Sequence, residues 1–526
     1  MCGIFLHFFK DGIIRKEMMT RLMYYYSLID HRGPDRNTLA IYNNALVGFH
    51  RLAINDLSKK GDQPFELKGE VLMCNGEIYN YDALQYEHQF PLQSKSDCEI
   101  ILHMFQLYGV EEALQRIDGV FAIVYITKSS IYMIRDRIGV KPLFYCTSFD
   151  IVSLLTVASE PIALDGLHQT ISEVMPSTFI IFPKDGDTIE TRLYHHFSTI
   201  PSYYLPDTDK AIRDVHDTLV HAVQKRLCSD RPIGCLLSGG LDSSIIASIL
   251  SREMKKRGQK LTTFSVGFPD STDLVYARKV ADYLQTDHRE LVIQYKDAIN
   301  YIPAVIKKLA SYDTTTIRAS TPMYMLCEWI NKNFPHRVIF SGEGSDELFC
   351  GYLYSYNAPT DEDLAQDSIR LVNQLYLYDV LRADRCTAGN SLEFREPFLD
   401  QDLVQLSFEL SGEVKRPKEY EKDILRRAFV GYLPNEVLWR RKAAFSDAVS
   451  SSEKPWYKWI HEHVQSLDQT KIEAFGGTLE SNYYKTVFSS IYKYYRPSIP
   501  LWLPQWSDTN GEPSATVLNV YKKEEH

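Results

Sequence analysis

A cysteine stands at position 2 of this chain of 526 residues, and an N-terminal cysteine can act as a nucleophile. If Met1 is removed, Cys2 carries both a thiol and a free α-amino group, and an amine with a pKa of about 8 can act as the base for the thiol beside it. Taken alone, the position is a weak indication, because a small residue before a buried strand is common. The neighbouring motifs must therefore show whether Cys2 is a catalytic nucleophile or only a packing residue.

A second chemical string, Ser238-Gly239-Gly240-Leu241-Asp242-Ser243-Ser244, lies between an apolar run at Ile233–Leu237 and a helical pattern. Glycines let backbone N–H groups approach a phosphate, serine hydroxyls add donors, and a helix N-terminus adds partial positive charge. The chain contains no Gly-Lys-Ser/Thr, so this is not a Walker A loop. The string predicts a phosphate cradle of another type, and the alternative is a Gly-Gly turn with a helix cap.

An acidic loop, Ser341-Gly342-Glu343-Gly344-Ser345-Asp346-Glu347, follows the expected strand Val338–Phe340 and should open on the same edge of the sheet. Asp242 and Asp346 would then face each other across the phosphate site. Carboxylates beside phosphates repel unless a hard cation lies between them, so we expect Mg²⁺ held by these two residues and phosphate oxygens. The alternative is an acidic turn with exposed charges.

The serine and glycine string resembles the pyrophosphate loop of ATP pyrophosphatases, which adenylate a carboxylate or carbonyl and release pyrophosphate. In that family the adenine pocket follows the second strand, which is Phe264-Ser265-Val266-Gly267 here. The resemblance implies that ATP is a substrate and that its contacts are Leu236, Ser238, Gly239, Gly240, Asp242, Ser243, Ser244, Val266, Ser341 and Gly342.

Five strings near the N-terminus resemble the class II glutamine amidotransferase domain, whose nucleophile is an N-terminal cysteine. They are Cys2-Gly3-Ile4-Phe5, His31-Arg32-Gly33-Pro34-Asp35, Arg51-Leu52-Ala53-Ile54, Asn75-Gly76-Glu77-Ile78-Tyr79-Asn80 and Lys95-Ser96-Asp97. In a glutaminase the Asn75 amide and the Gly76 N–H can supply the two donors of the oxyanion site. The glutamine site implied by the resemblance consists of Arg51 for the carboxylate, Glu77 and Asp97 for the ammonium, and Leu52, Ile54 and Asn75.

A glutaminase followed by an adenylating loop resembles the glutamine-hydrolysing asparagine synthetase family, and the resemblance continues nearly to the last residue. It implies a ligase that makes asparagine from aspartate, ATP and glutamine-derived ammonia through β-aspartyl-AMP, with release of AMP and pyrophosphate. Thr315–Pro322 resembles the aspartate segment, with Thr315, Thr316, Arg318 and Thr321 as contacts. Lys442 would meet pyrophosphate, and Glu343 would be the base for the attacking ammonia.

The chain departs from the family pattern at Glu396, at Ala443-Ala444 and at Cys350. Two other interpretations stay open: an enzyme that amidates a different carboxylate, and a catalytically silent relative kept for binding or regulation. The presence of Cys2, Asn75, Asp242, Glu343, Asp346 and Lys442 argues against silence. The family resemblance also suggests a homodimer.

Two kinds of secondary structure must position these groups. Strand patterns bounded by turns dominate the first 200 residues, with helical patterns near Lys16–Ile29 and Asp97–Tyr108, and predict an α+β layered sandwich. With the resemblance, this is an Ntn-hydrolase-like glutaminase domain at residues 2–200. The prolines of Ile200–Pro206 end it. From residue 208 to 526, strands alternating with helices predict an α/β doubly wound parallel sheet, the synthetase domain, with a largely helical C-terminal part.

Composition limits the partners. The 58 Lys and Arg residues against 68 Asp and Glu give a net charge of −10, which argues against nucleic acid or an anionic membrane as a partner. No apolar run approaches the ~20 residues needed to cross a bilayer. The nine cysteines include no CxxC pair, which favours buried thiols in a reducing compartment. We therefore expect an unexported cytoplasmic protein whose partners are small molecules.

Overall fold

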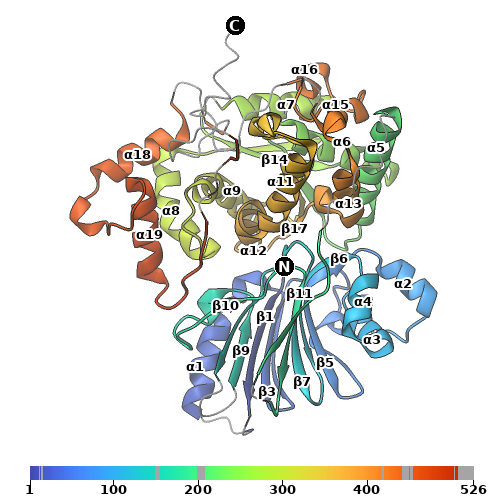
Figure 1. The fold of residues 1–526 in the computed structure, drawn as a ribbon, viewed down its shortest axis with the longest axis vertical. Coiled ribbons are helices and arrows are strands. Elements are labelled where there is room, and N and C mark those ends of the chain that lie inside the picture. The colour runs from blue at the N-terminus through green and yellow to red at the C-terminus, as the bar shows by residue number, and fades with distance from the viewer. Residues whose placement is uncertain are drawn as a thin grey trace.

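Two antiparallel sheets face each other in the first domain of the computed structural model (Figure 1). The structure describes residues 1–10, 12, 16–148, 154–186, 188–197, 208–269, 271–416, 420–440, 449–450, 454–500, 502 and 504–506. The first sheet has the order β10 (Ser172–Glu173), β8 (Phe144–Ser148), β9 (Leu154–Ala158), β1 (Gly3–Phe9), β3 (Ala45–Arg51), β2 (Arg36–Tyr42). The second has the order β12 (Glu190–Leu193), β11 (Thr178–Pro183), β7 (Ser130–Arg135), β6 (Gly119–Ile126), β5 (Glu70–Ile78), β4 (Phe65–Leu67).

Helices cover the outer faces of both sheets. Ile4, Leu6 and Phe8 of β1 pack between the sheets, whereas Phe5 and Phe9 pack on the other side with α1 (Lys16–Ser27). The second sheet is covered by α2 (Tyr81–His88), α3 (Glu99–Tyr108) and α4 (Val110–Arg116). Because both faces of β1 are covered, it is apolar on both sides rather than alternating. The predicted α+β layered sandwich is confirmed.

A five-stranded parallel sheet forms the centre of the second domain. Its order is β15 (Asp287–Val292), β14 (Thr262–Gly267), β13 (Ile233–Leu236), β16 (Val338–Phe340), β17 (Glu393–Arg395). Helices lie on both faces: α5 (Thr208–Lys225), α6 (Leu241–Lys256) and α7 (Thr272–Leu284) on one, and α8 (Tyr295–Leu309) and α9 (Thr314–Asn333) on the other. The predicted doubly wound sheet is confirmed.

The rest of the second domain is mainly helical, as expected. Its helices are α10 (Ser345–Leu348), α11 (Asp361–Gln374), α12 (Asp379–Ala388), α13 (Gln401–Glu409), α14 (Gly412–Lys415), α15 (Asp423–Ala428), α16 (Asn435–Leu438), α18 (Trp456–Ser466) and α19 (Leu479–Ile491). Short 3₁₀ turns lie at Asp30–Arg32, Lys59–Gly61, Pro161–Ala163, Leu353–Asn357, Leu375–Leu377, Pro397–Leu399 and Gln469–Lys471.

Two elements differ from the sequence expectation. The helical sequence pattern predicts a helix over Pro322–Asn333, but helix α9 begins at Thr314, because the Asp313 side chain caps it by accepting a hydrogen bond of 2.8 Å from Thr316 N. Strand β17 was not predicted, since three residues are too few to show a pattern. Both differences affect the candidate sites.

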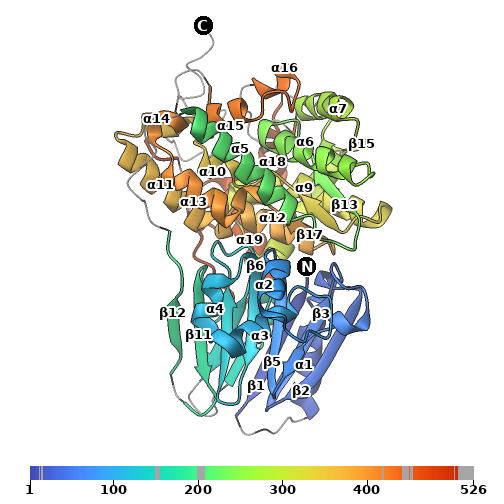
Figure 2. The same ribbon diagram turned by 90° about the vertical axis from the view of Figure 1, so that its right-hand side faces the viewer.

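The two domains meet near the N-terminus, which lies at their junction in both views (Figure 1 and Figure 2). Asp230 of the second domain accepts a hydrogen bond from Asp56 N (2.9 Å) and donates one to Ile54 O (3.0 Å). The Ser391 hydroxyl donates to His31 O (2.6 Å). The expected boundary at residues 200–206 lies outside the described residues.

Candidate active sites

A pocket in the first domain contains every glutaminase residue that the sequence predicts. Its lining includes Cys2, Arg51, Leu52, Ile54, Asn75, Gly76, Glu77 and Asp97, together with Met1, Lys141 and Glu393. Strand β1 brings Cys2, the end of β5 brings Asn75, Gly76 and Glu77, and the residues before α3 bring Asp97. The predicted residues, up to 95 positions apart in the sequence, are thus gathered around one thiol.

The Cys2 backbone is fixed against Asn75. Cys2 N donates a 2.8 Å hydrogen bond to Asn75 Oδ1, and the Cys2 thiol lies 3.7 Å from Leu52 O. Asn75 is 1% exposed, and its Nδ2 has no hydrogen-bond partner among the described residues. A buried, unpaired N–H beside a thiol is available to an oxyanion that forms there.

Met1 occupies space inside this pocket. Its side chain is 2% exposed and its Sδ lies 2.8 Å from Lys141 Nζ. Burial lowers the pKa of its α-amine to about 6. Removal of Met1 would place the new α-amine at Cys2 N, beside Asn75 Oδ1. Burial also raises the pKa of the Cys2 thiol, so a neighbouring base is needed to activate it.

The Arg51 guanidinium is turned toward a nearby loop. Nη1 donates to Ser58 O (2.7 Å) and to Asp62 Oδ1 (2.6 Å), and Nη2 donates to Asn55 O (3.2 Å) and to Asp56 O. A bidentate grip on a substrate carboxylate would require some of these bonds to be released. The predicted role of Arg51 therefore stays a prediction.

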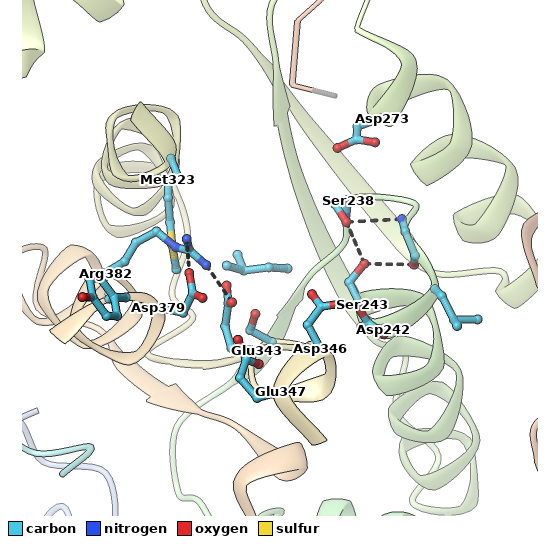
Figure 3. A pocket seen from close by; sticks show the side chains of 18 of the residues that line it. Ser238, Asp242, Ser243, Asp273, Met323, Glu343, Asp346, Glu347, Asp379 and Arg382 are labelled. Atoms are coloured by element: carbon cyan, nitrogen blue, oxygen red, sulfur yellow. Dashed lines mark hydrogen bonds and ion pairs between the residues drawn. The ribbon is translucent and has the colours of Figure 1, made fainter. Parts of the chain in front are cut away.

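The second pocket lies at the carboxyl ends of β13, β14 and β16 (Figure 3). Its lining includes Leu236, Ser238, Gly240, Asp242, Ser243, Val266, Ser341 and Gly342 of the predicted nucleotide site, and Thr315 and Thr316 of the predicted aspartate site. The Ser238 and Ser243 hydroxyls are 3.0 Å apart, and Ser238 N donates to Ser243 Oγ (3.2 Å). The loop is therefore held by its own serines.

Glycines bring the two loops of this pocket into contact. A Cβ on Gly342 would lie 2.7 Å from the backbone of Asp242, which is closer than side chains can approach. Gly239 has a φ of +76°, and a Cβ there would lie 2.4 Å from Ala277 N. Larger residues at either position would push the loops apart.

Lys422 joins the two aspartates expected to hold Mg²⁺. Its Nζ lies 2.7 Å from Asp242 Oδ2 and 2.6 Å from Asp346 Oδ1, and Lys422 is 2% exposed. Both carboxylates therefore reach a single cation, which fits the donor set that Mg²⁺ takes beside phosphates. Sequence reasoning missed Lys422, because nothing in its local pattern marks a lysine as buried.

Glu343 faces the pocket next to two further charged residues. Its Oε2 accepts a 2.7 Å hydrogen bond from Arg382 Nη2, and Arg382 Nη1 lies 2.5 Å from Asp379 Oδ1 (Figure 3). Burial raises the pKa of Glu343 to about 7, although Arg382 opposes the shift. A carboxylate with this pKa suits a base working near neutral pH. Sequence analysis gave Arg382 and Asp379 no role.

Comparisons with known proteins cover both domains. A family model described as a glutamine amidotransferase domain matches residues 1–202, and one described as asparagine synthase matches residues 214–370 and 356–493. The asparagine synthetase [glutamine-hydrolyzing] of Homo sapiens is 37% identical, over 99% of this chain and 99% of that protein. The chain belongs to the glutamine-hydrolysing asparagine synthetase family. The corresponding protein of Gallus gallus is 36% identical, also over 99% of both chains.

Among solved structures, an allosteric regulatory enzyme of purine biosynthesis is similar to this chain, with 16% identity and a TM-score of 0.31. The similarity covers 53% of this chain and 78% of that enzyme's chain. A glutamine phosphoribosylpyrophosphate amidotransferase from B. subtilis matches 53% of this chain and 79% of its own, with 17% identity and a TM-score of 0.31. No helix in the described part of the chain has the length and apolar character needed to cross a membrane.

Four residues that were predicted to contact ATP or aspartate do not line the second pocket: Gly239, Ser244, Arg318 and Thr321. Helix geometry explains most of the difference. Thr315, Thr316, Ala319 and Met323 share the pocket face of α9, so Arg318 and Thr321 point elsewhere. Ser244 lies in the first turn of α6 and is 0% exposed.

Arg318 instead forms a buried ion pair with Glu480 of α19, with Nη2 to Oε2 at 2.7 Å and Nε to Oε1 at 2.9 Å. The expectation that it binds a substrate carboxylate gains no support from this position. Lys442 and the Ala443-Ala444 departure lie outside the described residues. Arg440, which sequence reasoning also missed, lines the pocket and donates to Gly239 O (3.2 Å).

Two departures from the family pattern lie in buried places. Glu396 is 0% exposed, neither carboxylate oxygen has a hydrogen-bond partner among the described residues, and burial raises its pKa to about 7. Cys350 has a φ of +53°, in the left-handed region that favours glycine. Neither residue lines the pockets described above.

Proposed function

We propose that the chain synthesises asparagine from aspartate and ATP, with nitrogen released from glutamine. The glutaminase domain would span residues 2–200 and the synthetase domain residues 208–526. The observation that carries this proposal is the presence of both pockets in one chain: Cys2 beside the unpaired Asn75 amide in one, and Glu343 beside the Ser238–Ser243 loop in the other.

In the glutaminase half, the Cys2 thiol attacks the amide carbon of glutamine, and ammonia leaves from the tetrahedral intermediate. Asn75 Nδ2 and Gly76 N–H stabilise the oxyanion. Glu77 and Asp97 bind the ammonium group of glutamine. Arg51 binds the carboxylate of glutamine once its guanidinium has released the nearby loop. Water then hydrolyses the glutamyl thioester to glutamate.

In the synthetase half, the β-carboxylate of aspartate attacks the α-phosphorus of ATP, and pyrophosphate leaves, with Lys442 countering its charge. The loop from Ser238 to Ser243 holds phosphate oxygens. Ammonia attacks the β-aspartyl adenylate, Glu343 takes the surplus proton, and AMP leaves. Arg382 and Asp379, beside Glu343, can meet the α-carboxylate and α-ammonium of aspartate, which Arg318 does not approach.

Asp242 and Asp346 would hold Mg²⁺, together with phosphate oxygens. When bound, Mg²⁺ neutralises phosphate charge and stabilises the departing pyrophosphate. Lys422 lies on the same two carboxylates and would have to yield part of its contacts. The homodimer implied by the family resemblance stays a prediction.

The test measures glutamate, pyrophosphate and asparagine in parallel for the wild type, Cys2→Ala and Asp242→Asn. Cys2→Ala should abolish glutamine-driven synthesis while added ammonia still supports it. Asp242→Asn should abolish synthesis with either nitrogen source while glutamine hydrolysis survives.

Replacing aspartate with other carboxylates distinguishes a different acceptor, and the absence of all three products from folded wild type would indicate a silent relative. Loss of ammonia-driven synthesis in folded Cys2→Ala would contradict the assignment of two separate sites.

A further inference from the structure

Strand β17, at the edge of the parallel sheet, reaches from the second domain into the glutaminase pocket. All three of its residues are buried. Glu393 lines the pocket that contains Cys2, and Arg395 Nη2 lies 3.2 Å from Glu77 Oε2. Because alternate residues of a strand share a face, Glu393 and Arg395 both point toward the first domain.

Arg395 is held rigidly in this position. It is 1% exposed, its Nε donates a 2.9 Å hydrogen bond to Glu393 Oε1, and its Nη1 donates to Cys228 O (2.6 Å) and to Arg226 O. Contacts on several sides fix the direction of the guanidinium, whose Nη2 lies 2.8 Å from Glu393 Oε1 and 3.2 Å from Glu77 Oε2.

Glu77 belongs to a crowded group of acids. Asn55 Nδ2 donates to Glu77 Oε2 (2.9 Å) and to Asp97 Oδ1 (3.1 Å). Burial, Asp97 and Glu393 together raise the pKa of Glu77 well above its usual range, whereas Arg395 acts in the opposite direction. The titratable or charged groups that act on or through Glu77 are Asp97, Glu393, Arg395, Tyr79 and Cys98.

We propose that Arg395 is a positioning residue of the glutaminase site: it favours the charged form of Glu77 and holds its carboxylate in place for the ammonium group of glutamine, so the synthetase domain completes the glutamine pocket. This inference rests on the proposed glutaminase activity. Glu393 accepts a hydrogen bond from Arg395, and its negative charge opposes the charged form of Glu77.

The same residue also contacts the nucleotide side. Ser341 N, at the start of the acidic loop, donates a 3.1 Å hydrogen bond to Arg395 O. The side chain of Arg395 therefore serves one pocket while its carbonyl anchors a loop of the other. No other strand of the parallel sheet has a residue in the lining of the glutaminase pocket within the described part of the chain.

The test replaces Arg395 with Met, which keeps length but removes charge. At pH 7, KM for glutamine should rise about tenfold or more, because a charge-assisted contact is lost, while kcat at saturating glutamine changes little. The KM of Arg395→Met should fall as pH rises, since higher pH ionises Glu77. Arg395→Lys should restore part of the affinity.

A second variant, Glu393→Gln, predicts the opposite sign. It removes a neighbouring negative charge, so Glu77 should ionise at a lower pH. The curve of KM for glutamine against pH should therefore shift to lower pH. The matched control is Arg318→Met, since Arg318 is also a buried arginine (3% exposed) paired with a buried glutamate, Glu480 (2.7 Å), and it lines neither pocket. It should lower the melting temperature and leave the pH dependence of KM as in the wild type.

Opposite shifts in Arg395→Met and Glu393→Gln support the proposal. Unchanged KM profiles in folded variants overturn it, and so does a loss shared equally by kcat, KM and ammonia-driven synthesis, which indicates a structural role. Calorimetric titration of glutamine into Cys2→Ala, with and without Arg395→Met, measures binding without turnover. If wild type hydrolyses no glutamine, the proposed function fails; if it does and the titrations agree, only this inference fails.

Discussion

The two pockets carry their charges in different ways. In the glutaminase pocket, Asn75, Gly76 and Glu77 lie within β5, whose partner β6 pairs Asn75 with Ala122 and Glu77 with Val120. In the nucleotide pocket, the functional groups lie on loops and first helical turns beyond parallel strands. Strand positions are fixed by neighbouring strands, whereas loop positions depend on the loop's own contacts.

The counter-ions differ as well. The acids of the nucleotide pocket are neutralised from within it, by Lys422 for Asp242 and Asp346 and by Arg382 for Glu343. The counter-ion of Glu77 comes from behind the pocket, on a strand of the other domain. Ligands of the nucleotide pocket must therefore exchange with protein cations, whereas Glu77 can keep its counter-ion when glutamine binds.

After the complete losses expected for Cys2→Ala and Asp242→Asn, the largest effect that separates the pockets should come from Glu343→Gln. Removal of a general base typically lowers the rate about 10² to 10⁴-fold, so ammonia-driven asparagine formation should fall by this factor while glutamine hydrolysis continues. In the wild type, synthesis should decline as pH falls through about 7, because burial places the pKa of Glu343 there and the protonated form accepts no proton. Initial rates, expressed per concentration of free NH₃, measure both. A wild-type rate in Glu343→Gln would remove Glu343 from the mechanism.

Asn75→Ala should act on the other pocket alone. Loss of one oxyanion donor typically costs about 10² to 10³-fold in kcat, so glutamate formation should drop by that amount. Ammonia-driven synthesis in the same preparation is the control and should match the wild type. Equal losses in both assays would mean that the pockets are not independent.

The smallest effect should distinguish the two faces of α9. Thr316 lines the nucleotide pocket, whereas the Thr321 hydroxyl donates to Ile317 O (2.9 Å) within the helix. Thr316→Val should raise KM for aspartate about 2 to 10-fold, the usual range for one neutral hydrogen bond, and Thr321→Val should leave it unchanged. Steady-state kinetics at saturating ATP measures the pair. If Thr321→Val raised KM for aspartate more than Thr316→Val, a different face of α9 would contact aspartate.

How far the sequence predicts the sites depends on the element that carries each motif. Around Cys2 and Asn75 the motif residues lie on strands and in tight loops, and every residue predicted as a glutamine contact lines the pocket. The segment from Thr315 to Thr321 was treated as a string of contacts, but on a helix only one face can point at a ligand. Arg318 therefore pairs with Glu480 instead.

Other residues could not be found from local patterns. Lys422 and Arg395 are important because of what they meet across the fold, and a buried cation in sequence looks like any surface charge. Strand β17 is three residues long and becomes a strand only because β16 pairs with it, Val338 with Glu393 and Phe340 with Arg395. Tertiary context, not local propensity, forms it.

The pairing of Glu77 with Arg395 also has a consequence for biosynthesis. The ribosome adds Arg395 about 320 residues after Glu77, which at typical elongation rates of roughly 5 to 20 residues per second is roughly 15 to 60 s. During that interval the nascent first domain has its acids but lacks their counter-ion. Glutamine hydrolysis would thus become efficient only when the domain that consumes the ammonia has emerged, so an incomplete chain wastes little glutamine.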